Sequence, residues 1–170
     1  TLVTTTVSGN ASDDYTGGVH TGCGTTTSLS HCTIVNNISN ASNENHAGGV
    51  SGNGTVTVTN TIIANNADGN GRNDCQGTLV SQGYNLIEDA STCTIEGDTT
   101  GNITGVAPLL RALEDNGGPT PTHFPLTGSP IMDNGSCAAS TDQRGEPRPV
   151  DLDDTFYPNG SGGACDIGAV

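Results

Sequence analysis

The nine residues Leu29-Ser30-His31-Cys32-Thr33-Ile34-Val35-Asn36-Asn37 decide the fold, because their pattern recurs on both sides of them. Leu29 aligns with Leu2, 27 residues earlier, and with Val58, 29 residues later. Two further columns keep the same offsets: Val7, Ile34 and Ile63, and Asn10, Asn37 and Asn66. Each unit combines a strand, a bend, a second strand and an Asn turn. A repeat of this length with several short strands is typical of one coil of a three-sided parallel β-helix.

The columns also predict how the coils stack. A further strand starts after each Gly pair, at Gly17-Gly18-Val19 and at Gly48-Gly49-Val50. Equivalent strands of stacked coils satisfy each other's backbone donors and acceptors, and Gly and Asn suit the corners because both accept left-handed conformations. His31 aligns with Thr4 and Asn60, which predicts a corner or surface position. A leucine-rich repeat would need a Leu spacing that is missing, and a β-sandwich would not produce such columns.

The composition fits one narrow, all-β domain. Aromatic residues make up only 3% of the 170 residues and Trp is absent, whereas Thr, Ser, Asn and Gly dominate. Short β-branched strands joined by Gly and Asn turns have this composition. We expect registered coils over residues 1–70, then the last coils and an irregular C-terminal cap over residues 71–170. The cap should cover the last coil, because the edge strand would otherwise stay open.

The charge excludes some partners. The formal net charge is −14, from 18 acidic residues against four arginines and no lysine. Nucleic-acid binding needs clustered Lys and Arg to neutralise phosphates, so we expect no nucleic-acid partner. An anionic membrane surface would repel the chain, and no stretch of 18 apolar residues predicts membrane insertion.

Six cysteines in a chain of this size favour disulfides and an oxidising compartment. Zinc is not expected, because no Cys-x-x-Cys or Cys/His metal spacing occurs. Six thiols can pair in many ways, and the sequence alone does not choose among them. Proximity along the chain suggests Cys23–Cys32, Cys75–Cys93 and Cys137–Cys165.

Short blocks in the second half of the chain carry a resemblance to a known family. They are Asn73-Asp74-Cys75, Gly83-Tyr84-Asn85-Leu86-Ile87, Asp115-Asn116-Gly117-Gly118-Pro119-Thr120-Pro121-Thr122-His123, Gly128-Ser129-Pro130-Ile131-Met132-Asp133, Thr141-Asp142-Gln143-Arg144-Gly145-Glu146-Pro147-Arg148-Pro149 and Cys165-Asp166-Ile167-Gly168-Ala169. Their order and wording strongly resemble the choice-of-anchor Q domain of exported bacterial right-handed parallel β-helix proteins.

The resemblance covers about the last hundred residues and implies architecture and location rather than chemistry. It implies a right-handed parallel β-helix with three strands per coil, a disulfide-stapled C-terminal cap and an extracellular or cell-surface location. Pairs comparable with Cys75–Cys93 and Cys137–Cys165 occur in the family. Family members are typically large exported proteins, most of them without demonstrated catalysis, so the resemblance implies no enzyme.

The residues present no clear catalytic constellation. A polysaccharide lyase, which the β-helix fold often hosts, needs a basic residue on the coils, and none of the four arginines lies there. Arg144 and Arg148 are expected to pair with acids such as Asp142 or Asp166 and to hold the cap in place. Asp13-Asp14 are adjacent and would point to opposite sides of a strand. The four histidines, which are His20, His31, His46 and His123, are scattered along the chain.

Two kinds of binding or modification site stay open. Asp151, Asp153 and Asp154 offer several oxygens within one loop, so calcium is the candidate ligand; no other cofactor is expected. Seven Asn-x-Ser/Thr sequons make glycosylation a hypothesis, at Asn10, Asn37, Asn40, Asn53, Asn102, Asn134 and Asn159.

The sequence therefore favours a non-catalytic extracellular structural module of a cell-surface or matrix layer. Thr1-Leu2 already lies inside a registered strand, so the first coil is expected to be open. End-to-end association of copies through that edge would give a filament. Truncation of a longer chain explains the same edge equally well. A carbohydrate-binding or polysaccharide-degrading β-helix, a lyase or hydrolase, is the alternative function.

Overall fold

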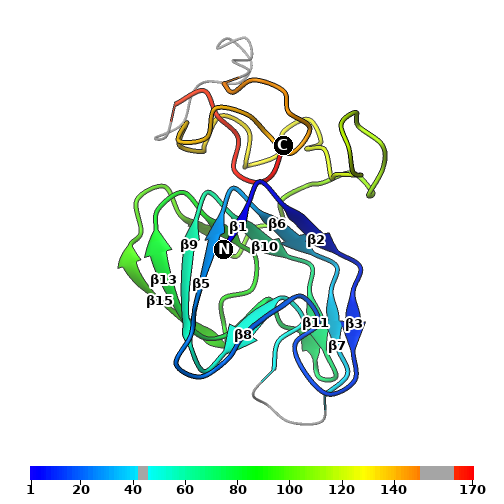
Figure 1. Ribbon diagram of the computed structural model, residues 1–170, viewed down its shortest axis with the longest axis vertical. Helices are drawn as coiled ribbons and strands as arrows, with labels where there is room; N and C mark the ends of the chain where they lie inside the picture. Colours follow the sequence, from blue (N-terminus) through cyan, green and yellow to red (C-terminus); the bar gives the residue numbers. More distant parts are fainter. Residues whose placement is uncertain (42–45, 150–162) are drawn as a thin grey trace.

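The computed structural model describes residues 1–41, 46–149 and 163–170. Over these residues the chain is all-β and contains no helix. Parallel strands stack into a β-helix of about three turns, as the repeat predicts. Figure 1 shows the coils as one body, with the C-terminal segment lying to one side of it.

The strands form three sheets. The first sheet holds β1 (Leu2–Val3), β5 (Thr26–Ser30), β9 (Thr55–Thr59), β13 (Cys75–Gln82) and β15 (Cys93–Asp98), and β13 extends it to β8 (Val50–Gly52) and β4 (Val19–Thr21). The second sheet holds β2 (Thr6–Ser8), β6 (Thr33–Val35), β10 (Ile62–Ala64), β14 (Leu86–Ile87) and β16 (Ile103–Thr104). The third sheet holds β3 (Ala11–Ser12), β7 (Ile38–Ser39), β11 (Ala67–Asp68) and β12 (Gly71–Arg72), with β12 antiparallel to β11.

The strand register confirms the two apolar columns. In the first sheet Leu2 pairs with Leu29, and Leu29 pairs with Val58. In the second sheet Ile34 pairs with Val7 on one side and with Ile63 on the other. These side chains point inward, where the residues of the later coils are fully buried. The core is thus a stack of apolar layers, one from each coil.

The corner between the first and second sheets uses a left-handed residue in each coil. The φ angle is 42° at Thr4, 52° at His31, 47° at Asn60 and 57° at Tyr84. The corner position predicted for His31 is therefore confirmed. Its side chain is buried rather than on the surface, because the C-terminal segment covers it: His31 Nε2 lies 3.4 Å from the carbonyl oxygen of Ser136.

The expectation that the C-terminal segment covers the last coil is wrong. The segment packs against the side of the β-helix, along the outer face of the second sheet (Figure 1). Gln143 Oε1 accepts a hydrogen bond from Thr6 Oγ1 in the first coil, at 2.7 Å. Ala169 N donates to Thr33 Oγ1 in the second coil, at 3.0 Å. The strand β15 of the last coil stays largely exposed.

This lateral packing follows from strands that are apolar on both faces. All three residues of β6 and all three of β10 are buried. Ile63 faces the coil interior, whereas Ile62 packs outward against Ile131 and Ile167 of the C-terminal segment. Gly168 makes the close approach: a Cβ atom there would lie 2.6 Å from Ile62 Cδ1. A sheet covered on both sides needs such continuous apolar strands.

Candidate functional site

The two arginines of the Thr141–Pro149 block take part in structural contacts. Arg144 Nη2 lies 2.6 Å from Asp142 Oδ2 in a largely buried ion pair. Arg148 donates from Nη1 to the carbonyl oxygen of Asp166 at 3.0 Å and from Nη2 to that of Gly168 at 2.8 Å. The predicted pairing with an acid is confirmed for Arg144, whereas Arg148 binds backbone carbonyl groups. Both arginines hold the C-terminal segment together.

A cavity of about 250 Å³ opens beside these arginines. Phe124 and Met132 supply much of its apolar lining, and the Arg144 guanidinium lies 5.0 Å from the centroid of the Phe124 ring. Burial raises the pKa of the Asp166 carboxyl to about 6, and burial lowers the pKa of Arg148. Two acids and two arginines line the cavity and compensate each other, which indicates a structural role.

An asparagine ladder crosses the coils on the other side of the second sheet. The backbone N and Nδ2 of Asn10 both donate to Asn37 Oδ1, at 3.1 and 2.9 Å. The same two atoms of Asn37 donate to Asn66 Oδ1, each at 3.0 Å. Asn66 in turn donates twice to Asp74 Oδ1, each time at 2.8 Å. The predicted Asn column is therefore confirmed, and Asp74 extends it.

Asp74 gives the ladder a direction. Its Oδ2 accepts a hydrogen bond from Asp89 N at 2.8 Å, so both carboxylate oxygens act as acceptors. The side chain is fully buried, and this burial raises its pKa to about 6. Because every rung donates from one coil to the next, a group that only accepts can end the ladder. Asp74 is thus a structural residue rather than a catalytic one.

Two of the three suggested disulfides are present. Cys75 is bonded to Cys93, and Cys137 to Cys165. The pairing Cys23–Cys32 is wrong: Cys23 is exposed in the turn before β5, whereas Cys32 is buried and packs in the coil core. Two disulfides fit an oxidising, non-cytosolic environment. No helix among the described residues has the length and apolar character of a membrane span.

The sequon asparagines differ in their accessibility. Asn37 is fully buried and its amide is a rung of the ladder, so in the folded chain it cannot carry a glycan. Asn102 is half-buried and accepts a hydrogen bond from Asn85, and Asn134 is half-buried in the C-terminal segment. Asn10, Asn40 and Asn53 are exposed, whereas Asn159 lies outside the described residues.

The calcium candidates Asp151, Asp153 and Asp154 also lie outside the described residues. Among the residues that the structure describes, no group of three or more His, Cys, Asp or Glu side chains is arranged to hold a metal ion. Asp13 and Asp14 are exposed in the loop after β3, where Asp13 Oδ1 accepts a hydrogen bond from Asn40 Nδ2 at 3.0 Å.

The histidines fall into two groups. His31 and His123 are buried under the C-terminal segment, and the two nitrogens of His123 lie 2.8 Å from Ser8 Oγ and 2.8 Å from the Arg111 carbonyl oxygen. His20 and His46, which are 26 residues apart in the sequence, lie together instead. Sequence reasoning missed this pair, although its signal was available in the register of the two Gly-Gly-Val segments.

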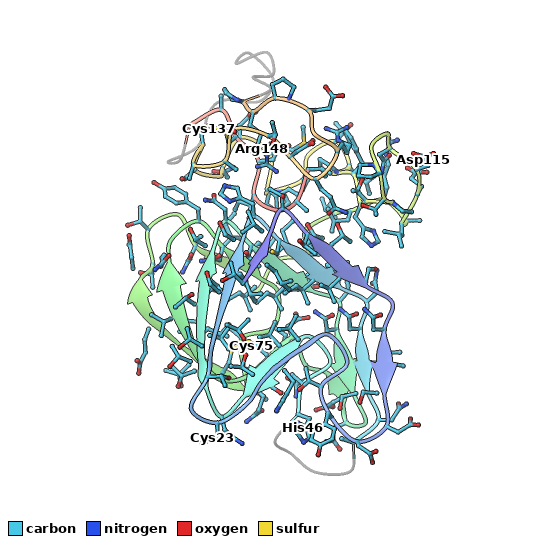
Figure 2. The ribbon with its side chains drawn as sticks, viewed as in Figure 1. Cys23, His46, Cys75, Asp115, Cys137 and Arg148 are labelled. Atoms are coloured by element: carbon cyan, nitrogen blue, oxygen red, sulfur yellow. A yellow bond between two sulfur atoms is a disulfide. The ribbon has the colours of Figure 1, made fainter. Side chains whose placement is uncertain are left out.

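His20, His46 and Tyr15 form a cluster of rings, the Tyr15 cluster, at the end of the molecule remote from the C-terminal segment. The ring centroids lie 5.6 Å apart for His20 and His46, 5.7 Å for Tyr15 and His20, and 5.3 Å for Tyr15 and His46. Figure 2 shows His46 on the side of the coils opposite Cys137 and Arg148. The cluster is thus separate from the C-terminal cavity.

Comparisons with protein-family models, curated proteins and solved structures find no match to this chain. The fold rests on the strand register and the core described above.

Proposed function

We propose that this chain is a non-catalytic structural module of an extracellular, cell-surface or matrix layer, and that copies associate end to end. The observation that carries the proposal is the lateral position of the C-terminal segment. Because that segment covers the side of the β-helix, strand edges remain available at both ends of the described coils: β1, β2 and β3 at one end, β15 and β16 at the other. Open edges are templates for pairing with further strands.

The use of polar side chains supports a structural role. The ladder from Asn10 to Asp74 joins successive coils, while Arg144 and Arg148 hold the C-terminal segment. Two disulfides staple the second half of the chain. These groups stabilise the scaffold, and a durable extracellular layer needs such reinforcement.

The ends of the coils have the chemistry that stacking requires. Leu2 and Val7 of the first coil are only partly buried, and so is Ile95 of the last coil, although all three pack against the core. A coil stacked on either end would complete their burial. Removing such apolar surface from water stabilises the association by about 25 cal/mol per Å².

Inward-facing lysines test this mode of association. Leu2→Lys places an ammonium group at one end of the core, where stacking would bury it without a partner. Val3→Lys is the matched control, because Val3 is the next residue of β1, points outward and is 52% exposed. Ile95→Lys and Thr94→Lys form the corresponding pair in β15.

Sedimentation velocity and electron microscopy of the recombinant chain provide the measurement. We expect linear assemblies that grow with protein concentration, that Leu2→Lys and Ile95→Lys abolish, and that both control variants retain. A wild-type chain that stays monomeric at high concentration contradicts end-to-end association. Turnover of an acidic polysaccharide, tested with and without calcium, contradicts the non-catalytic role and supports the carbohydrate-active alternative.

A further inference from the structure

The Tyr15 cluster gathers two imidazole rings from successive coils. His20 lies in β4 of the first coil, and His46 lies just before β8 of the second. Their neighbours are in register, because Val19 pairs with Val50 and His20 with Ser51. The loop segments also bond directly: Gly17 N donates to the Ala47 carbonyl oxygen at 3.3 Å. The fold therefore places the two histidines together.

Hydrogen bonds from the coils fix the loop that carries Tyr15 and His20. Ser39 Oγ donates to the Tyr15 carbonyl oxygen at 2.7 Å, and Tyr15 N donates to Ser12 Oγ at 3.1 Å. Thr16, which is buried, lies with its hydroxyl 3.4 Å from His20 Nδ1 and hydrogen-bonded to the hydroxyl of Ser51. A second group on one ring nitrogen orients an imidazole and leaves its other nitrogen for a ligand.

The side chains in the cluster are accessible and incompletely bonded. Tyr15 is 58% exposed and His20 is exposed, so the cluster can be reached from solvent. His46 is half-buried, and its Nδ1 is buried without a hydrogen-bond partner. A buried polar atom without a partner is costly and needs an explanation. Ring packing alone does not supply one, because it leaves that nitrogen unsatisfied.

The separation of the two imidazole rings suits a shared metal ion. A zinc–nitrogen bond of about 2.0–2.1 Å places a ring centroid about 3.2 Å from the metal. Two imidazoles bound at an angle between tetrahedral and linear then have centroids about 5–6 Å apart. The centroids of His20 and His46 are 5.6 Å apart. The rings can thus reach one ion by side-chain rotation, without movement of the coils.

We propose that His20 and His46 bind one divalent transition-metal ion of the Zn²⁺, Ni²⁺ and Cu²⁺ class, with water in the remaining positions. Neutral imidazole prefers these ions, whereas Ca²⁺ prefers oxygen ligands. The net charge of −14 raises the local concentration of cations around the chain. The site joins the first coil to the second and is independent of the association proposed above.

Isothermal titration calorimetry with Zn²⁺ and Ni²⁺ tests the site. The titrations use the Cys23→Ser chain, because Cys23 is an exposed free thiol that can itself bind these ions. We expect one saturable site at neutral pH, and we expect His20→Gln to weaken it by at least about tenfold. His20 is exposed, so this variant should fold normally. His46→Gln should have the same effect, with its fold checked by thermal unfolding in EDTA.

Two controls make the result specific. Tyr15→Phe keeps the ring contacts and removes the hydroxyl, so it should leave the affinity unchanged. Ca²⁺ in place of Zn²⁺ should give no heat from this site. Absence of a saturable site for both transition metals, or binding that survives His20→Gln, overturns the proposal and leaves the cluster as a packing contact.

Discussion

At the scale of single residues, neighbouring asparagines in the turns have different tasks. Asn36 takes the left-handed conformation, with φ of 59°, and Asn65 does the same in the next coil with φ of 55°. The residue that follows each of them, Asn37 or Asn66, points inward and forms a rung of the ladder. The recurring Asn-Asn pair therefore encodes a turn and a hydrogen-bonded stack in two adjacent positions.

This division of tasks predicts opposite outcomes for two adjacent substitutions. Asn37→Ala leaves the partners of a fully buried amide, among them Asn10 N and the Val7 carbonyl oxygen, without hydrogen bonds. We expect a loss of about 3 kcal/mol in the free energy of unfolding, since each unsatisfied buried group costs about 1–3 kcal/mol. Asn36→Gly should change it by less than about 0.5 kcal/mol, because Gly adopts the left-handed conformation without strain. Equilibrium unfolding in urea measures both; equal losses would contradict the assignment.

At the scale of the strands, the two faces of the second sheet serve different neighbours. Ile62 and Ile63 are adjacent in β10 and both are buried, but Ile62 contacts the C-terminal segment and Ile63 the coil core. The same alternation places Val35 outside and Ile34 inside. One strand thus belongs to two separate apolar clusters.

Substitutions on the two faces should loosen different parts of the molecule. Ile62→Ala and Ile63→Ala should each cost about 2–5 kcal/mol, because both remove buried methyl groups. We expect Ile62→Ala to raise amide hydrogen exchange in residues 131–135 and 165–169 while β5 and β9 stay protected. Ile63→Ala should raise exchange in β5 and β9 as well. Identical exchange patterns for the two variants would show that the two clusters unfold as one unit.

The sequence predicted the coils better than the C-terminal segment, for a physical reason. Register between coils repeats at short separations, so Leu2, Leu29 and Val58 appear as a column. The packing of the C-terminal segment depends on unique contacts between distant residues, such as Thr33 with Ala169, 136 positions apart. Its available signal was the continuous apolar run Ile62-Ile63-Ala64, which indicates burial on both faces.

Proximity along the chain was a weak guide to side-chain chemistry for the same reason. Cys23 and Cys32 are close in sequence, but one lies in an exposed turn and the other points into the core. Conversely, His20 and His46 seemed scattered until the coil register brought them within 5.6 Å of each other. Spatial neighbours in a β-helix lie one coil apart, not a few residues apart.

At the scale of the whole molecule, stability should depend on pH in an unusual direction. Burial raises the pKa values of Asp74 and Asp166 to about 6, above the ordinary carboxyl value of 3.8. The folded chain therefore binds more protons than the unfolded chain between about pH 4 and pH 6, and stability falls as the pH rises through this window. For Asp74 the effect is on the order of 2 kcal/mol.

Urea unfolding at a series of pH values between 4 and 7 measures this dependence. We expect the unfolding midpoint to decrease with rising pH in the wild-type chain and to decrease less in Asp74→Asn. The control Asp13→Asn removes an exposed acid and measures the general effect of the net charge. If Asp13→Asn flattens the profile as much as Asp74→Asn does, the buried ladder is not its source.

The lateral C-terminal segment has a mechanical consequence. A stack of coils held only by neighbour contacts can peel apart from an end, one coil at a time. Here one strap, stapled by Cys137–Cys165, contacts the first coil at Thr6, the second at Thr33 and the third at Ile62. Tension along the axis therefore loads these contacts together in shear, so the first coil cannot detach before the strap slides. The strap makes a string of weak links respond to force as one body.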